Sequence, residues 1–134
     1  MTEIEWIRSD DDTIAIIIRK KFQPDETSFI TPDEFNQQIG FIVYEKGGKI
    51  KPHKHLPLER DIIGTSETLL LRSGRVEVDL FNLDRQLIAK RELGEGDILV
   101  LVSGGHGFRM LEDSIFIEVK QGPYTGMIEK EIFD

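Results

Sequence analysis

The chain is predicted to be an all-β sandwich or barrel. Short runs of apolar and β-branched residues recur along the sequence, and glycines or polar turns separate them. Residues 75–81 alternate apolar and polar side chains, as expected for a strand with one face toward solvent. Only Thr31–Glu34 has the pattern of a helix start, with a capping threonine, a proline and a glutamate, and Gly40 limits that helix to about two turns.

Nine segments carry the strand pattern, and turn residues lie between them. Residues 9–12, Ser-Asp-Asp-Asp, indicate a solvated turn, and residues 82–84 indicate another. No repeat or linker divides the 134 residues, so we expect a single domain, residues 1–134. The expected strands are residues 13–22, 41–44, 67–72, 75–81, 86–93, 97–102, 108–111, 115–120 and, at a sheet edge, 127–133.

Composition excludes several classes of function. The formal net charge is −8 and no basic stripe is present, which disfavours nucleic acid and anionic membranes as partners. There is no cysteine, so disulfides and thiolate metal sites are excluded. The apolar runs are shorter than the roughly 20 residues of a membrane span, and the acidic N-terminus is unlike a signal peptide. A cytoplasmic location is therefore expected.

All three histidines occupy positions that suit a metal site. His53 and His55 form an H-x-H pair, and on a β-strand residues i and i+2 point to the same face. His106 follows the apolar run of residues 98–102. A third imidazole from a neighbouring strand, with one carboxylate, would complete a site that leaves coordination positions open.

The region around the first two histidines resembles the first motif of the cupin superfamily. Gly47 stands six positions before His53, and Gly74 stands seven positions after Glu67, as in that motif. The pattern is interrupted between His55 and Glu67, where eleven residues replace the usual three or four.

The region around His106 resembles the second cupin motif in part. Gly96 begins it, but Val102 stands where the family has proline. Gly104 fits, although the turn to His106 is one residue short, and Met110 occupies the usual asparagine position. The two glycines before His106 permit an unusual turn that would still bring it to the site.

The resemblance covers about residues 40–120 and implies a small antiparallel β-barrel of the double-stranded β-helix, or jelly-roll, type. It also implies a homodimer and one divalent metal inside the barrel, held by His53, His55, Glu67 and His106. This ligand set suits Fe, Mn, Zn, Ni or Cu, and the sequence does not choose between them.

Two features near the first motif leave alternatives open. Glu59 lies at the distance from His55 that the cupin motif gives for its glutamate, so it is an alternative carboxylate ligand. Glu67 is preferred because it is expected to begin a strand, which would hold it rigidly. The insertion Leu56–Ser66 is either a lid or rim carrying Arg60, or a hairpin or dimer arm.

Strand alternation predicts which neighbours share a face with the ligands. Arg72 and Arg109 are expected to point away from them, and Tyr124 is expected to pack or to reach the rim. The side chains that should share the ligands' faces, and belong mainly to the core, are Leu69, Leu71, Phe108 and Met110.

The family's members include dioxygenases, isomerases, epimerases, sugar-binding domains and storage proteins, so the fold alone does not define a function. The leading hypothesis is a small metal-dependent enzyme acting on a polar small molecule, such as a sugar or sugar acid, by isomerase or oxygenase chemistry. The alternative is a binding or sensing module without turnover. A purely structural barrel is a third class.

Overall fold

The computed structural model describes residues 3–123, 125–126 and 130–134. These residues form strands, turns and irregular segments and contain no α-helix, so the all-β prediction is confirmed. The chain divides into two compact units, one of Met1–Phe22 with Thr65–Asp134 and one of Gln23–Gly64.

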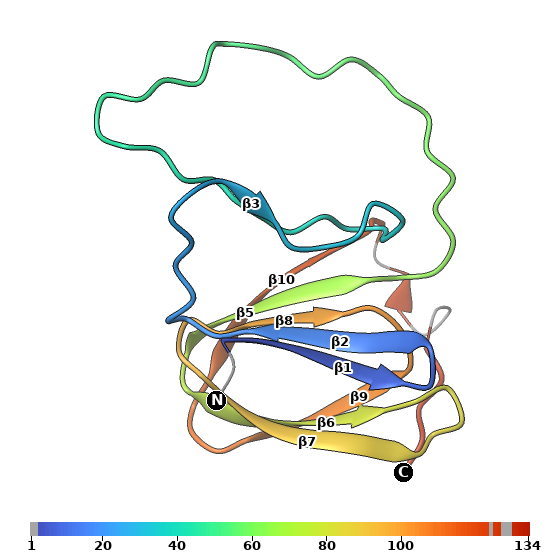
Figure 1. Ribbon diagram of the computed structural model, residues 1–134. Helices are drawn as coiled ribbons and strands as arrows, with labels where there is room; N and C mark the ends of the chain where they lie inside the picture. Colours follow the sequence, from blue (N-terminus) through green and yellow to red (C-terminus); the bar gives the residue numbers. More distant parts are fainter. Residues whose placement is uncertain (1–2, 124, 127–129) are drawn as a thin grey trace. The chain divides into compact units, whose positions relative to one another are not determined.

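The larger unit is a sandwich of two antiparallel sheets that lie one above the other (Figure 1). The five-stranded sheet contains, in spatial order, β1 (Ile4–Ser9), β2 (Asp12–Ile18), β8 (Ile98–Leu101), β5 (Glu67–Ser73) and β10 (Ile115–Lys120). The three-stranded sheet contains β7 (Leu87–Gly94), β6 (Arg75–Phe81) and β9 (Gly105–Met110).

The two sheets share one apolar core. On β6 the residues Val76, Val78 and Leu80 are fully buried, and charged residues stand between them, which confirms the alternation in the sequence. From the other sheet, Leu69 and Leu71 of β5 join the same cluster. Burying one such side chain contributes about 1.5–3 kcal/mol, so the apolar face of each strand holds the sheets together.

A buried carboxylate ties the end of β2 to the turn before β8. Asp97 accepts hydrogen bonds from the backbone nitrogens of Gly94 at 2.8 Å and Lys20 at 2.9 Å. It also pairs with the guanidinium of Arg19 at 3.0 Å. The carboxylate is thereby compensated where it is removed from solvent, and the turn that precedes β8 is fixed.

The turn between β5 and β6 requires the glycine of the motif. Gly74 has a φ of +101°, and a Cβ there would lie 2.2 Å from the Oγ of Ser114. Both the backbone conformation and the close approach exclude a larger residue, so β5 can reverse directly into β6.

The sequence predicts the turn and the second strand of the N-terminal hairpin but not its first strand. The acidic segment at residues 9–12 does form a turn, with Ser9 paired to Asp12, and Asp10 has a φ of 55°. The strand before it, β1, was not predicted, because Glu5 and Arg8 interrupt its apolar residues. The Arg91 guanidinium of β7 donates three hydrogen bonds of 2.7–3.0 Å to the Glu5 carboxylate, so the charge of Glu5 is compensated within the sandwich.

The smaller unit contains one short strand pair, β3 (Ser28–Phe29) with β4 (Gly40–Phe41). The strand expected over residues 41–44 is therefore reduced to its first residue. The helix expected from Thr31 is absent: the Thr31 hydroxyl accepts a bond from the Ile39 nitrogen at 3.0 Å, and Gln38 Nε2 donates to the Pro32 carbonyl at 2.9 Å. These bonds close a loop and replace the capping contacts that a helix would need.

Two further expectations concern the C-terminal end of the chain. Residues 127–129 of the strand predicted over 127–133, and Tyr124, lie outside the described residues, whereas residues 130–134 form no strand. No described sheet closes into a barrel, so the jelly roll stays a prediction, as does the single domain. No helix among the described residues has the length and hydrophobicity needed to cross a membrane.

Candidate functional site

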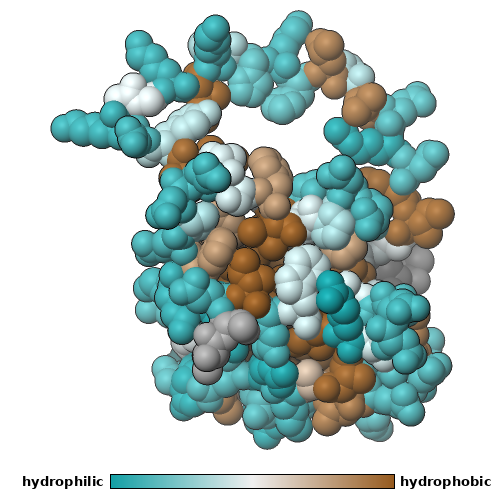
Figure 2. Space-filling model, in the orientation of Figure 1, coloured by the Kyte–Doolittle hydropathy of each residue, from teal (hydrophilic) through white to brown (hydrophobic). Residues whose placement is uncertain are grey.

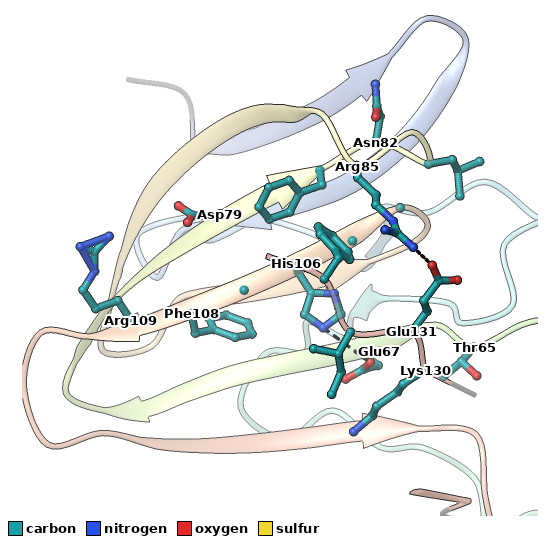
Figure 3. Close-up of a pocket in the computed structure, with 17 residues that line it drawn as sticks. Thr65, Glu67, Asp79, Asn82, Arg85, His106, Phe108, Arg109, Lys130 and Glu131 are labelled. Carbon is teal, nitrogen blue, oxygen red and sulfur yellow. Dashed lines mark ion pairs between the residues drawn. The ribbon is translucent and has the colours of Figure 1, made fainter. Parts of the chain in front are cut away.

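Glu67 and His106 face each other from the two sheets of the larger unit (Figure 3). Glu67 is the first residue of β5, and His106 is the second residue of β9. The Oε1 of Glu67 lies 3.9 Å from the Nε2 of His106, and the side chains are 17% and 32% exposed. The sandwich thus brings two predicted ligands together from distant parts of the chain.

The two glycines before His106 make this placement possible. Gly104 has a φ of +74°, and a Cβ there would lie 2.2 Å from the carbonyl oxygen of Phe81. Gly105 then pairs with Phe81 and begins β9, so that His106 pairs with Leu80. The imidazole packs edge-on against Phe108, with 5.8 Å between ring centroids, which restricts its orientation.

Strand alternation around the two residues is largely as expected. Leu69 and Leu71 are buried on the face of Glu67, and Phe108 packs against the core. Met110 is 52% exposed, so its expected place in the core or pocket is wrong, because β9 ends there at the sheet edge. Arg72 is exposed, as expected of a residue that points away from the ligands.

The surroundings of Glu67 disfavour its charged, deprotonated form. Burial is the main cause that raises its pKa to about 7, and a hydrogen bond and charge repulsion from Glu118 add to it. Lys120 and Lys130 act in the opposite direction. The carboxyl group therefore changes its protonation within the physiological range.

Burial also lowers the pKa of His106 below its ordinary value, with Lys130 acting in the same direction and Glu118 against it. A neutral imidazole is the form that binds a metal. The distance is suitable as well: two atoms each about 2.1 Å from one ion are at most about 4.2 Å apart. Within the described residues, however, no three or more His, Asp or Glu side chains form a metal-binding group.

His53 and His55 lie in the smaller unit, both exposed, in a segment without strands. The expectation that a strand would align them is wrong, because Pro52 and Pro57 lack the N–H groups that a ladder needs. Their rings are nevertheless neighbours, with 5.3 Å between centroids. His53 Nδ1 lies 2.8 Å from the carbonyl oxygen of Lys51. Because a carbonyl only accepts, Nδ1–H donates this hydrogen bond, and Nε2 is the nitrogen available to a metal.

The segment around the histidines is irregular and polar. Residues 56–65 of the insertion are all exposed and form no strand, so the hairpin alternative is wrong, and Glu59 and Arg60 lie on it. Its exposed apolar residues are Leu56, Leu58, Ile62 and Ile63. Glu67, by contrast, begins a strand as predicted. The lid and dimer-arm alternatives, and the choice of carboxylate ligand, stay predictions.

Glu67 and His106 form part of the lining of a pocket of about 860 Å³ in the larger unit (Figure 3). Its volume suits a small organic molecule. Arg109, expected to face away from the ligands, also borders this pocket, but it is 62% exposed and is paired with Glu77. The pocket therefore extends from the two candidate ligands to a charged outer rim.

Residues 130–133 of the C-terminal segment form one side of this pocket. Glu131 pairs with Arg85, and the Phe133 ring meets Phe81 edge-on at 5.1 Å between centroids. The Arg85 guanidinium also lies 5.4 Å from the centre of the Phe133 ring. Gly105 leaves room for that ring, since a Cβ would lie 2.8 Å from the Cζ of Phe133.

Sequence reasoning missed Glu118 and Lys130. Glu118 could have been found, because alternation on β10 puts it on the same face as Phe116, which packs against the core. Lys130 has no such signal: it lies outside any strand and belongs to no motif.

Comparisons with protein-family models, with curated proteins and with solved structures find no match to this chain. The resemblance to the cupin superfamily therefore stays a prediction from the sequence.

Proposed function

We propose that this protein binds one divalent transition metal and uses it on a polar small molecule in the pocket beside Glu67 and His106. The observation that carries the proposal is the convergence of these two side chains, 3.9 Å apart, from opposite sheets. The cupin resemblance of the sequence implies His53 and His55 as the other two ligands. The jelly-roll barrel and the homodimer, which the cupin resemblance implies, are part of the same proposal.

The electrostatics of the site support a cation there. Glu67 is desolvated and lies against a second carboxylate, Glu118, which together raise its pKa to about 7. Such an arrangement disfavours the folded state when both groups are charged, unless a positive ion lies between or beside them. A bound metal cation would attract both carboxylates and so offset their mutual repulsion.

The chain's own residues have definable parts in such a site. His106 binds as a neutral imidazole whose orientation Phe108 restricts. Glu67 supplies negative charge from a fixed strand, and the pocket admits the ligand and limits its contact with water. A bound divalent ion would polarise an oxygen of the ligand or acidify a water, which suits isomerase chemistry, and iron would add oxygenase chemistry.

Calorimetric titration with Zn²⁺ of the metal-free protein tests the proposal. The wild type should bind about one equivalent, and Glu67→Gln and His106→Ala should each weaken binding by about 10–100-fold. Glu59→Gln is the matched control, because it removes the same charge from the rival position and should leave the affinity unchanged. Equal affinities for wild type and both ligand variants would contradict the proposal.

Turnover separates the enzyme from a binding module. A module binds metal and sugar without consuming the sugar, whereas an enzyme converts it. Proton NMR of a sugar incubated with the metal-loaded protein distinguishes these alternatives directly.

A further inference from the structure

Residues 46–58 of the smaller unit form an irregular segment that is exposed along its whole length. The segment contains four lysines, at positions 46, 49, 51 and 54, and no aspartate or glutamate. It therefore carries a formal charge of +4, whereas the rest of the chain, with the other 13 of the 17 basic residues and all 25 acidic ones, carries −12. The expectation that anionic membranes are not partners rests on the charge of the whole chain, and this segment departs from that average.

The positive charge of this segment is not compensated locally. In the larger unit, by contrast, Arg75 pairs with Glu92 and Lys90 pairs with Asp79, each at 2.8 Å. Within the described part of the chain, none of the segment's four ammonium groups forms an ion pair with a carboxylate. Four like charges that lie close in sequence without counter-charges attract an anionic surface.

The same segment exposes three large aliphatic side chains. Ile50, Leu56 and Leu58 are 56%, 74% and 68% exposed. Figure 2 shows both hydrophilic and hydrophobic residues at the surface of this loop, which is drawn from turquoise to green in Figure 1. One exposed aliphatic residue is ordinary, but several among lysines form the combination that binds a lipid surface, because aliphatic groups enter the acyl boundary while lysines meet the head groups.

Contacts within the smaller unit hold the chain on both sides of the segment. Before it, the backbone nitrogen of Val43 donates to the Thr27 hydroxyl at 3.0 Å. After it, Asn36 Nδ2 donates to the carbonyl oxygen of Ile63 at 3.0 Å. The segment between them belongs to no strand, so its side chains can meet a surface without the loss of any ladder hydrogen bond.

We propose that residues 46–58 bind the surface of an anionic phospholipid membrane, with the lysines at the head groups and the three aliphatic side chains at the acyl boundary. The segment has no Phe, Tyr or Trp on which bases could stack, which favours a membrane over single-stranded nucleic acid. Charges are screened over about 8 Å at physiological salt, so lysines in contact with head groups outweigh acidic residues farther away. The inference goes beyond the proposed function and does not rest on it.

Sedimentation with sucrose-loaded vesicles tests the inference. One set of vesicles contains equal parts of phosphatidylserine and phosphatidylcholine, and the other contains phosphatidylcholine alone. EDTA is present throughout, so the outcome is independent of the metal site. The charge variant is Lys46→Gln/Lys49→Gln, and its matched control is Lys20→Gln/Lys21→Gln, which removes the same charge from exposed lysines outside the segment.

The wild type should sediment with the phosphatidylserine vesicles and not with phosphatidylcholine alone. Lys46→Gln/Lys49→Gln should weaken the partition coefficient by roughly 30-fold, whereas the control pair should leave it within about threefold of wild type. Leu56→Ser should weaken it by roughly tenfold, and Leu87→Ser, which removes an exposed leucine of β7, should not. All these side chains are exposed or half-exposed, so urea unfolding should show that the variants remain folded.

Several results overturn the inference. The first is a wild type that sediments with neither set of vesicles or equally with both. The second is an equal loss in the two lysine pairs, which would assign the effect to net charge. The third is an unchanged partition coefficient in Leu56→Ser, which would leave the aliphatic side chains without a part. Complete release from the vesicles by duplex DNA at an equal concentration of negative charge would identify nucleic acid as the better partner.

Discussion

Glu67 begins a strand of one sheet and His106 lies in a strand of the other, with 3.9 Å between Oε1 and Nε2. The packing of the two sheets sets their separation, and the glycine turn before His106 brings its side chain into place. Glu67 is held where its charge is unfavourable. A carboxylate kept at a cost to stability is characteristic of a functional site.

The first prediction concerns stability without metal. The pKa of Glu67 is raised from 4.5 to about 7 on folding. Its contribution to stability is therefore fully present below pH 4.5 and is lost as the pH rises through 7. Metal-free Glu67→Gln should be more stable than wild type at pH 8, by about 1–2 kcal/mol after allowance for partial exposure, and no more stable at pH 4.5. Urea unfolding at the two pH values measures this.

Glu59→Gln serves as the control for this effect. Glu59 is exposed in an irregular segment, so its substitution should leave the unfolding free energy within about 0.5 kcal/mol of wild type at both pH values. A Glu67→Gln protein that is less stable than wild type at pH 8 would show that the carboxylate is favourable where it lies.

The second prediction is the pH dependence of metal binding. Protons and the metal compete for Glu67, and its pKa of about 7 means that this competition extends to neutral pH. Zn²⁺ affinity should rise between pH 6 and pH 8 and should fall steeply below about pH 6 as the ligands become protonated. Calorimetric titrations across this range measure it. Occupancy that is unchanged down to pH 4 would exclude these ligands.

The third prediction tests the glycine turn before His106. Gly104→Ala adds a Cβ that would lie 2.2 Å from the Phe81 carbonyl oxygen, at a φ of +74°. It should destabilise the protein by about 1–3 kcal/mol and weaken Zn²⁺ binding, because β9 must shift. Gly107→Ala, three residues further on and within β9, is the control, since a Cβ there meets nothing within 4 Å. Similar losses of stability and Zn²⁺ affinity in both variants would show that any added side chain in this region has the effect, and that the turn at Gly104 is not its specific cause.

The fourth prediction concerns the buried Asp97. Its carboxylate accepts from two backbone nitrogens and pairs with Arg19. Asp97→Ala leaves the two backbone donors without this acceptor and removes the negative charge beside Arg19, so it should cost about 3–5 kcal/mol in urea unfolding. Asp113→Ala removes an exposed carboxylate and should cost less than about 0.5 kcal/mol. A loss below 1 kcal/mol for Asp97→Ala would mean that the turn before β8 does not depend on this network.

The sequence predicts the fold best where strands lie against the core. Alternation identifies β6 because Val76, Val78 and Leu80 face a core, and Gly74 marks the turn before it. The pattern fails for residues 41–44, where Ile42 and Tyr44 are exposed and the apolar residues do not mark a strand. Local strand propensity does not show which apolar residues will pack against another part of the protein.

For the site, the sequence identifies Glu67 and His106 because a strand start and a glycine turn are local features. The expected strand at His53 and His55 is wrong, since the prolines on either side break the ladder. Alternation on β10 predicts the face on which Glu118 lies, but its closeness to Glu67 depends on the pairing of β10 with β5, which no local pattern contains.

Elemental analysis tests the central claim most directly. The protein is purified without a tag or a nickel column, beside His53→Ala/His55→Ala and His106→Ala variants. We predict close to one equivalent of iron, manganese, zinc, nickel or copper in the wild type and little in either variant. The same metal content in all three proteins, or none in the wild type even after incubation with these metals, would contradict it.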